Sequence, residues 1–468
     1  MVKKVGIVIC NYNKAEMVKK SIRTVLDNTF TDFDIFVVDN ASTDESVSVI
    51  EKTYMDLSSP SFDERVHLIC NRENFGGSGG FNTGLRYLMK EGYAYLMCID
   101  NDAFLDEGAI GALYDFLSNH SDTGIAASKI YDLENPDIVQ NYGQRINFDG
   151  FYTAVDYLGE VEDGSMPEVN YSDGVPACSL MVRREVIEKI GYLPESNFLY
   201  WDDTEWCYRC KLAGYKVASV GASQALHSMG AKKEDVTTFP IYYAWRNWIR
   251  FFVKFTPENK QFEMVETFLQ SIFQAQYEAL YSGQYEKAET IMAAYDDAIH
   301  GVTGRAKEGR IFPIHFEDAK YREFLTKNKV IFLNEGEMPL LSEKIQSMAD
   351  KIGCEPPKFI LLQEVENPED VLEKELDFRE TEQSVILNLC YSVFSENVSR
   401  RVAKMKYPSQ QYFLDENDCL VSAEHVESLQ KDYHTAGEAF YFSQMPMFLR
   451  KIRELRNEDT SLSKDEFL

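Results

Sequence analysis

The chain has 468 residues, more than one ordinary hydrophobic core holds, so its length predicts two or three domains. Apolar residues make up 44% of it and charged residues 26%, which is typical of a soluble globular protein. The formal charge of −28 argues against a general nucleic-acid-binding protein, because such proteins need positive surface to displace counterions.

Three further features favour a cytoplasmic protein. The sequence has no run of 18 apolar residues that would span a membrane, and its start "MVKKVGIVIC" passes into a strand-like run rather than a signal peptide. Nine cysteines, an odd number scattered along the chain, are typical of reduced thiols. Cys207 and Cys210 form a lone C-x-x-C, which two packing cysteines on a helix explain better than zinc or redox chemistry.

The first hundred residues alternate between strand and helix patterns. Short apolar runs rich in β-branched residues predict strands at 4–10, 34–40, 66–71 and 94–100. Apolar residues at helical spacing predict helices at 15–28, 43–54 and 77–92. This alternation predicts an α/β fold with a Rossmann-like, mostly parallel sheet and helices on both faces.

Polar residues follow each of these four strands, in the runs "CNYN", "VDNAST", "NRENFGG" and "IDNDA". In parallel sheets, ligands bind beyond the carboxyl ends of the strands. Any one of the runs is compatible with turn chemistry. Because four successive strands deliver Asn, Asp, Arg and Gly to one edge, we expect a binding site there.

The remaining sequence suggests further divisions. Residues 124–230 contain more strand and helix patterns, 239–258 form a strongly aromatic helix-like segment, and strand–helix alternation resumes at about 329. We therefore predict an N-terminal domain at 1–258, a helical linker or subdomain at 259–328, and a smaller C-terminal α/β domain at 329–468. No motif in the last of these indicates its role.

Asp100 and Asp102 stand at the end of the fourth predicted strand. Residues i and i+2 of a strand point to the same side, so both carboxylates can face one point just past the sheet. Two hard oxygen donors suit Mg²⁺ or Mn²⁺, and a metal would offset the repulsion between the two charges. A solvated turn at a strand end accounts for this pair equally well.

The segment "NFGGSGGFNTG" (74–84) is rich in glycine and precedes a predicted helix. Such a loop allows backbone N–H groups to approach a phosphate or a base closely. The segment matches neither a Walker A loop nor G-x-G-x-x-G, so a flexible turn is the simpler interpretation.

A third cluster is "FLYWDDTEWCYR" (198–209), where Asp202, Asp203 and Glu205 lie between two tryptophans. Acids beside indole rings are candidates for a raised pKa and proton abstraction. The alternative, compatible with the first, is an acidic helix N-terminus. His227 follows an apolar run, and a lone histidine gains weight as a ligand if a metal with two carboxylates needs a third donor.

In their order along the chain, "CNYN", "VVDNAST", "NRENFGGSGGFNTG", "CIDNDA", "YWDDTEW" and "LH" resemble the inverting glycosyltransferases of family 2, which have the GT-A fold. The resemblance covers about residues 4–250. Within that family, "NFGGSGGF", "WDDTE" and "YYAWRN" look like the galactofuranosyltransferases that build bacterial cell-wall polysaccharide, with rhamnosyltransferases as close competitors.

The resemblance implies roles for the candidate residues. Asp100 and Asp102 correspond to the D-x-D motif that holds Mn²⁺ or Mg²⁺ on the diphosphate of a nucleotide sugar, and His227 to the third metal ligand. Asp203 corresponds to the general base that deprotonates an acceptor hydroxyl, while Asp202 would hold the acceptor. The bound metal would neutralise charge on the departing diphosphate. The nucleoside pocket would contain Asn11, Tyr12 and Asp39, with Arg72, Asn74 and Gly76 on its other side.

Two departures from the family pattern concern the sugars. Galactofuranosyltransferases carry a tryptophan pair near where this chain has "GVPACSLM" (174–181), and a histidine where "YYAWRN" has Ala244. Both differences leave the donor sugar and the acceptor open. They do not affect the metal ligands or the base.

The segment 245–255 suggests contact with a membrane. Arg246, Arg250 and Lys254 recur every four residues and share one helix face, with aromatic residues around them. Such a helix can lie on a membrane surface, where lipid-linked acceptors reside. The alternative is a helix packed between domains, with its basic side chains reaching out to solvent.

The sequence thus predicts a cytoplasmic, metal-dependent glycosyltransferase, peripheral at the inner face of the cell membrane in the membrane-bound alternative. It would transfer a galactofuranose-like sugar from a UDP-sugar to a cell-wall or capsular glycan. The alternatives are a rhamnosyltransferase that uses a dTDP-sugar and a non-catalytic glycan-binding or sugar-nucleotide-binding module. Pure binding has no use for the base Asp203, which argues against the module. A homo-oligomer and a scaffolding role for the C-terminal half are compatible with catalysis, and no nucleic-acid partner is expected.

Overall fold

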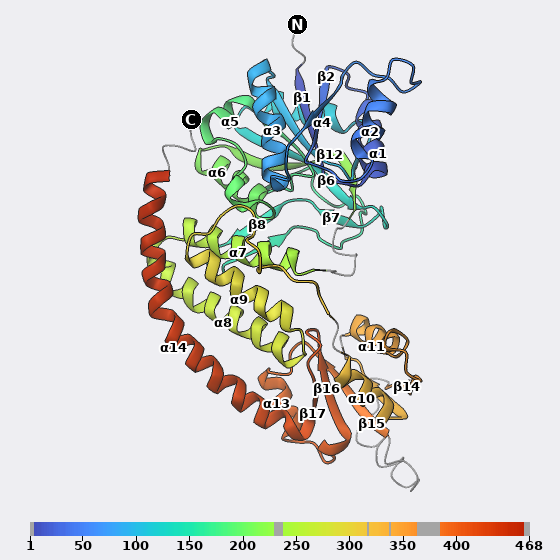
Figure 1. Ribbon diagram of the computed structural model, residues 1–468, viewed down its shortest axis with the longest axis vertical. Helices are drawn as coiled ribbons and strands as arrows, with labels where there is room; N and C mark the ends of the chain where they lie inside the picture. Colours follow the sequence, from blue (N-terminus) through green and yellow to red (C-terminus); the bar gives the residue numbers. More distant parts are fainter. Residues whose placement is uncertain (1–3, 229–236, 316–317, 337, 363–383, 463–468) are drawn as a thin grey trace.

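The computed structural model describes residues 4–228, 237–315, 318–336, 338–362 and 384–462, with side chains up to residue 456. Figure 1 shows a large α/β part that contains the N-terminus, a layer of helices beside it, and a smaller α/β part at the far end. The longest helix, α14, runs along one side and connects the small part back to the helical layer (Figure 1).

The N-terminal part is built on a ten-stranded sheet with the order β10-β12-β6-β11-β4-β1-β2-β3, to which β5 and β7 add beside β12 and β6. Its strands are β1 Val5–Asn11, β2 Phe33–Asp39, β3 Val66–Cys70, β4 Tyr95–Asp100, β5 Ala103–Leu105, β6 Thr123–Asp132, β7 Val139–Asn141, β10 Val169–Ser172, β11 Ser179–Arg183 and β12 Lys216–His227. A separate hairpin joins β8 Gln144–Asn147 to β9 Tyr152–Val155.

The first four strands confirm the predicted parallel sheet. β1 pairs in parallel with both β2 and β4, and β2 pairs in parallel with β3. Beyond β4 the sheet is mixed, because β11 runs antiparallel to both β4 and β6. Every residue of β6 is buried, as expected for a strand covered on both faces.

Helices cover both faces of this sheet. They are α1 Ala15–Leu26, α2 Ser46–Ile50, α3 Gly76–Glu91, α4 Ala109–Asn119, α5 Arg184–Ile190 and α6 Asp202–Leu212. The apolar side chains of α1, α2 and α4 form one core with the sheet, and those of α3, α5 and α6 form a second core on the other side. Cys207 and Cys210 are buried in the second core, which agrees with their interpretation as packing residues.

A layer of three helices follows, consisting of α7 Phe239–Phe255, α8 Gln261–Tyr281 and α9 Tyr285–Ile299. Aromatic and aliphatic side chains of α7 and α8 form a shared core, to which Phe151 from the β8–β9 hairpin contributes. The aromatic residues of the sequence segment 239–258 are therefore used mainly for packing.

This packing does not support the predicted membrane contact through 245–255. The side chain of Arg246 is 0% exposed, and Lys254 pairs with Glu205 at 3.0 Å. Helix α7 instead matches the alternative, a helix packed between layers. Among the described residues, no helix combines the length and apolar character needed to cross a membrane.

The C-terminal part has a five-stranded sheet of order β14-β13-β15-β16-β17, parallel except for β17. Its elements are α10 Ala319–Lys327, β13 Val330–Asn334, α11 Pro339–Ile352, β14 Lys358–Leu361, β15 Ser384–Cys390, α13 Glu396–Val402, β16 Gln411–Asp415 and β17 Leu420–Ser422. The predicted C-terminal α/β region is therefore present, although the sequence did not indicate β16.

The long helix α14 Ala423–Leu462 was not predicted from the sequence. It begins next to β17, and its later residues Met445, Phe448 and Ile452 join the core of the helical layer. The guanidinium of Arg456 donates hydrogen bonds to the carbonyls of Val253 and Thr256 at the end of α7. The predicted boundaries at 258 and 329 remain predictions, but α14 gives the C-terminal part a second attachment to the chain.

We expect Phe448→Ala to destabilise the protein by roughly 3–5 kcal/mol, because it removes a fully buried ring that contacts Phe268 and Tyr295. The measurement is denaturant unfolding followed by circular dichroism. Phe442→Ala is the matched control on the same helix, since that ring is 73% exposed and should cost little. Equal losses in the two variants would contradict the docking of α14.

Candidate functional site

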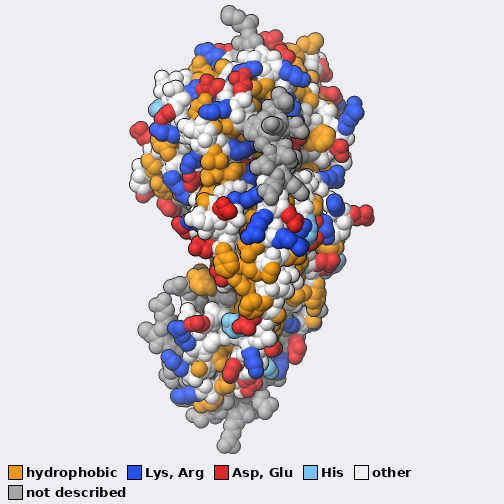
Figure 2. Space-filling view, turned by 90° about the vertical axis from the view of Figure 1, so that its left-hand side faces the viewer, with side chains coloured by type: hydrophobic (Ala, Val, Ile, Leu, Met, Phe, Trp, Pro, Cys, Tyr) orange, Lys and Arg blue, Asp and Glu red, His pale blue; other side chains and the backbone are white. Residues whose placement is uncertain are grey.

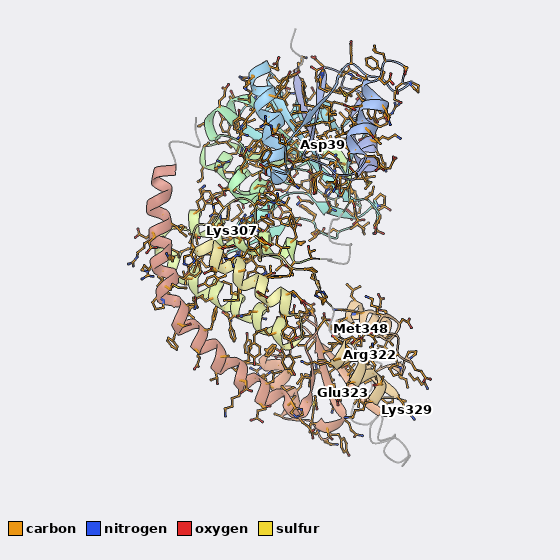
Figure 3. The ribbon with its side chains drawn as sticks, in the orientation of Figure 1. Asp39, Lys307, Arg322, Glu323, Lys329 and Met348 are labelled. Carbon is orange, nitrogen blue, oxygen red and sulfur yellow. The ribbon has the colours of Figure 1, made fainter. Side chains whose placement is uncertain are left out.

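The carboxyl ends of the parallel strands meet because of their register. Asn11 at the end of β1 pairs with Asp39 at the end of β2, and the neighbouring Cys10 pairs with Asp100 at the end of β4. Asn11 donates a hydrogen bond of 3.0 Å to Asp39, and Asn101 donates one of 2.8 Å to Asn11. Asp39, labelled in Figure 3, also accepts from the backbone N–H of Ser42. The predicted nucleoside-side residues Asn11 and Asp39 therefore lie together, buried at one edge.

The side chain of Asn40, just after β2, connects the segment between β3 and α3 to the same edge. The side-chain amide of Asn40 donates hydrogen bonds to the side chain of Asn74 at 3.0 Å and to the carbonyl of Gly76 at 2.9 Å. The side chains of the other two predicted pocket residues, Tyr12 after β1 and Arg72 after β3, are exposed.

The glycines of 76–80 belong to the first turns of α3 and not to a flexible loop. Gly76 has a φ of 77°, and a Cβ there would lie 2.0 Å from the carbonyl oxygen of Phe198. A Cβ on Gly80 would lie 2.3 Å from Cys10 Sγ. The glycines thus let α3 approach both β1 and the loop before α6 closely.

Asp100, Asp102 and His227 form a cluster that could hold a metal ion, with one ligand atom from each within 4.8 Å of the others. The antiparallel pairing of β5 with β12 places Ala103 opposite His227, and so carries Asp102 to the histidine. His227 Nε2 lies 3.7 Å from Asp100 Oδ2 and 3.5 Å from Asp102 Oδ1. Two carboxylates and an imidazole suit Mn²⁺ or Mg²⁺ with open positions, so the residues fit the expected metal.

The pKa values of the two carboxyl groups in this cluster shift in opposite directions. Burial raises the pKa of Asp100 to about 6, and the charge of Asp102 adds to this, while His227 opposes it. Burial also acts to raise the pKa of Asp102, but His227 in its protonated form and Lys14 outweigh it and lower that pKa to about 2. Asp102 is therefore held as a carboxylate, with Lys14 Nζ at 2.5 Å from Oδ2.

The second acidic cluster, Asp202 and Asp203, lies in the first turn of α6. The three preceding residues that carry positive φ are Phe198 at 64°, Tyr200 at 61° and Trp201 at 65°. Such conformations cost free energy in non-glycine residues and need support from their surroundings. The loop before the candidate base is thus a strained segment that the fold must hold.

Helix α7 supplies that support. The buried side chain of Asn247 donates hydrogen bonds to the carbonyls of Asn197, Leu199 and Tyr200. Arg246 donates from Nη1 to the carbonyl of Gly304 and from Nη2 to that of Asn197. These two residues of the "WRN" motif fix the loop that presents Asp202 and Asp203.

The aspartates at this helix start have raised pKa values. Burial, together with the charge of Asp203, raises the pKa of Asp202 to about 7, although Ser78 Oγ donates to its carboxylate at 2.9 Å. Burial also raises the pKa of Asp203, whose oxygens accept from the N–H groups of Thr204 at 2.7 Å and Ala177 at 3.3 Å. The charge of Asp203 contributes to the raised pKa of Asp100, so the two acidic clusters interact.

Several residues of this region were not singled out from the sequence. Lys14 follows "CNYN" directly, Gln140 accepts a hydrogen bond from His227, and Ser78 and Asn247 hold the second cluster. Lys14 beside a strand end, Ser78 within "NFGGSGGF" and Asn247 within "YYAWRN" had a sequence signal, whereas Gln140 lies in none of the quoted motifs and far along the chain from its partner.

Comparison with known proteins identifies the N-terminal part. Residues 6–191 match the sequence model of glycosyl transferase family 2. The chain is 24% identical over 314 residues to the low-salt glycan biosynthesis hexosyltransferase Agl10 of Haloferax volcanii, covering 65% of this chain and 93% of that protein. It is 28% identical over 192 residues to the dTDP-rhamnosyl transferase RfbF of Shigella flexneri, covering 40% of this chain and 61% of that protein.

Among solved structures, the chain is similar to GalNAc-T7 with UDP, GalNAc and Mn²⁺, at 14% identity and a TM-score of 0.45. That similarity covers 56% of this chain and 49% of the other. The family model and the curated relatives confirm the family-level resemblance found in the sequence motifs. The matches name both a hexosyltransferase and a rhamnosyltransferase, so they leave the sugar open.

The raised pKa of Asp202 predicts a pH-dependent stability. Between its ordinary value of 3.8 and about 7, folded Asp202 holds a proton that the unfolded chain has released, so stability falls as the pH rises through this window. Asp202→Asn removes that loss. We therefore compare the free energy of unfolding of the variant minus that of the parent. This difference should be about 1–3 kcal/mol larger at pH 8 than at pH 5.5.

Denaturant unfolding at the two pH values measures this difference. Asp137→Asn, at an exposed position, is the control and should show no such gain. An Asp202→Asn variant whose stability follows the parent's at both pH values would show that Asp202 is ionised throughout.

Proposed function

We propose that this chain, which is a glycosyltransferase of family 2, transfers a sugar from a nucleotide diphosphate donor to a glycan hydroxyl with inversion at the anomeric carbon. The proposal is supported by the closeness of a triad that could hold a metal ion to a pair of aspartates at a helix start, whose charges interact with Asp100. A triad without a base would suit binding alone, whereas the two together suit group transfer.

Asp203 is proposed as the general base. Its carboxylate is oriented by the N–H groups of Thr204 and Ala177, and its pKa is raised by burial, which increases its affinity for a proton. Asp203 would take the proton of the acceptor hydroxyl while the hydroxyl oxygen bonds to the anomeric carbon and the bond from that carbon to the diphosphate breaks. Asp202, held by Ser78, would hold the acceptor.

Asp100, Asp102 and His227 are proposed to hold Mn²⁺ or Mg²⁺ next to the donor diphosphate. The bound metal would supply positive charge where negative charge develops on the leaving group. Lys14, partly exposed and adjacent to Asp102, adds a fixed cation at this position. These local cations offset the overall charge of −28, which by itself would repel an anionic donor.

The donor nucleoside is proposed to lie between the ends of β1 and β2, with Asn11, Tyr12 and Asp39, and the loop of Arg72, Asn74 and Gly76. The donor is proposed to be a UDP-sugar with a galactofuranose-like sugar, and the acceptor a cell-wall or capsular glycan, lipid-linked or free. A dTDP-rhamnose donor is the second candidate, which the similarity to a dTDP-rhamnosyl transferase favours. A cytoplasmic location and a homo-oligomer remain part of the proposal.

Calorimetric titration with UDP, dTDP and GDP, each with and without Mn²⁺, tests the donor site. We expect one nucleotide to bind tightly only when Mn²⁺ is present: UDP supports the galactofuranose-type donor and dTDP the rhamnose donor. Asp102→Asn should weaken nucleotide binding in the presence of Mn²⁺ at least tenfold, about 1.4 kcal/mol. Asp106→Asn, at an exposed acid nearby in the sequence, should not weaken it. Metal-independent binding in the parent would contradict the triad assignment.

Asp203→Asn tests the base. We expect this variant to bind the donor nucleotide as the parent does and to lose at least a hundredfold in transfer rate, because the acceptor proton has no base to accept it. Transfer is measured as release of the nucleoside diphosphate with a glycan acceptor. Asp149→Asn, at an exposed acid, is the control. Transfer by Asp203→Asn at the parent rate would remove Asp203 from the mechanism.

A further inference from the structure

The amide side chain of Gln140, on β7, makes two contacts with His227. Its Oε1 lies 2.8 Å from Nδ1 of the imidazole, and its Nε2 donates to the backbone carbonyl of His227 at 3.4 Å. Gln140 and His227 are 87 residues apart in the chain, and their strands are connected through β6, which pairs with both β7 and β12.

These contacts determine where the proton of the imidazole lies. A backbone carbonyl only accepts hydrogen bonds, so the amide atom facing it must be the NH₂ group. The amide oxygen then faces the ring, and Nδ1 must carry a hydrogen to donate to it. Neutral His227 therefore has its lone pair on Nε2, the atom that faces Asp100 and Asp102 at 3.7 and 3.5 Å.

We propose that Gln140 is a positioning residue that holds His227 in the tautomer and orientation needed to bind a metal ion through Nε2. This inference rests on the metal site of the proposed function. Metal-binding histidines generally donate their other ring N–H to an acceptor, which fixes the ring and makes the ligand nitrogen more basic. A neutral acceptor suits this position, because a third carboxylate would add to the repulsion that already raises the pKa of Asp100.

The other side of the triad is arranged in the same way. Lys14 binds Oδ2 of Asp102, which leaves Oδ1 facing His227. Each of these two ligands is thus held from outside at one atom and directs its other atom inward. The short strand β7 places Gln140 against the imidazole ring of His227.

Mn²⁺ binding to the full chain, measured by calorimetry without nucleotide or acceptor, tests the proposal. We expect Gln140→Leu, which keeps the size but removes the acceptor, to weaken Mn²⁺ binding by about 10- to 100-fold. Gln140→Glu restores an acceptor and should bind within about tenfold of the parent. Gln224→Leu, at an exposed glutamine on β12, is the matched control and should bind Mn²⁺ like the parent.

The tautomer of His227 gives a second readout that a merely structural role would not move. Long-range ¹H–¹⁵N NMR of the metal-free parent, at a pH where His227 is neutral, should show the hydrogen on Nδ1, and Gln140→Leu should show a mixture. A hydrogen on Nε2 in the parent would overturn the proposal even if the leucine variant did not fold.

The two hypotheses fail differently. If the parent binds no Mn²⁺, the metal site of the proposed function falls and this inference with it. If the parent and a folded Gln140→Leu variant bind Mn²⁺ equally, only the role of Gln140 is overturned.

Discussion

The repulsion among four aspartates at one edge of the sheet is the constraint on which the rest of this structure depends. The charges of Asp102 and Asp203 add to the raised pKa of Asp100, those of Asp203 and Asp100 add to the raised pKa of Asp202, and burial makes each charge more costly. The fold offsets the cost at each member. Lys14 and His227 hold Asp102, Ser78 donates to Asp202, and backbone N–H groups hold Asp203. A bound divalent cation would complete this balance at the first pair.

The helical layer acts on the site through the backbone. Asn247 and Arg246 have no contact with the metal triad, yet they bind the carbonyls of the strained loop that ends at Trp201. That loop sets where α6 begins, and hence where Asp203 lies. Arg246, one of the basic residues of α7 that suggested a membrane surface, therefore supports this loop from inside the protein. Helix α14 in turn packs on this layer, so the C-terminal part is attached to the element that supports the loop before Asp202 and Asp203.

The family-level function rests on agreement between independent observations. Residues 6–191 match the family model and the curated relatives are glycosyltransferases, and the N-terminal part of the chain contains a triad that could hold a metal ion and the acidic pair Asp202 and Asp203. The sugar stays open, because the matches name both a hexosyltransferase and a rhamnosyltransferase, and because 174–181 lacks the tryptophan pair expected from the galactofuranosyltransferase resemblance.

The sequence by itself determined the local elements and the residues that end them. The first four strands and the polar residues at their carboxyl ends follow from periodicity and turn chemistry, because these are properties of neighbouring residues, and the strand–helix alternation predicts their parallel direction. Tertiary structure decided everything that depends on distant pairing. The β5–β12 ladder joins Asp102 to His227, β7 brings Gln140 to the same ring, and α7 buries Arg246. The glycines of 76–80 became a close helix contact and not a loop for the same reason, since Phe198, the neighbour that requires a glycine at Gly76, lies more than a hundred residues away.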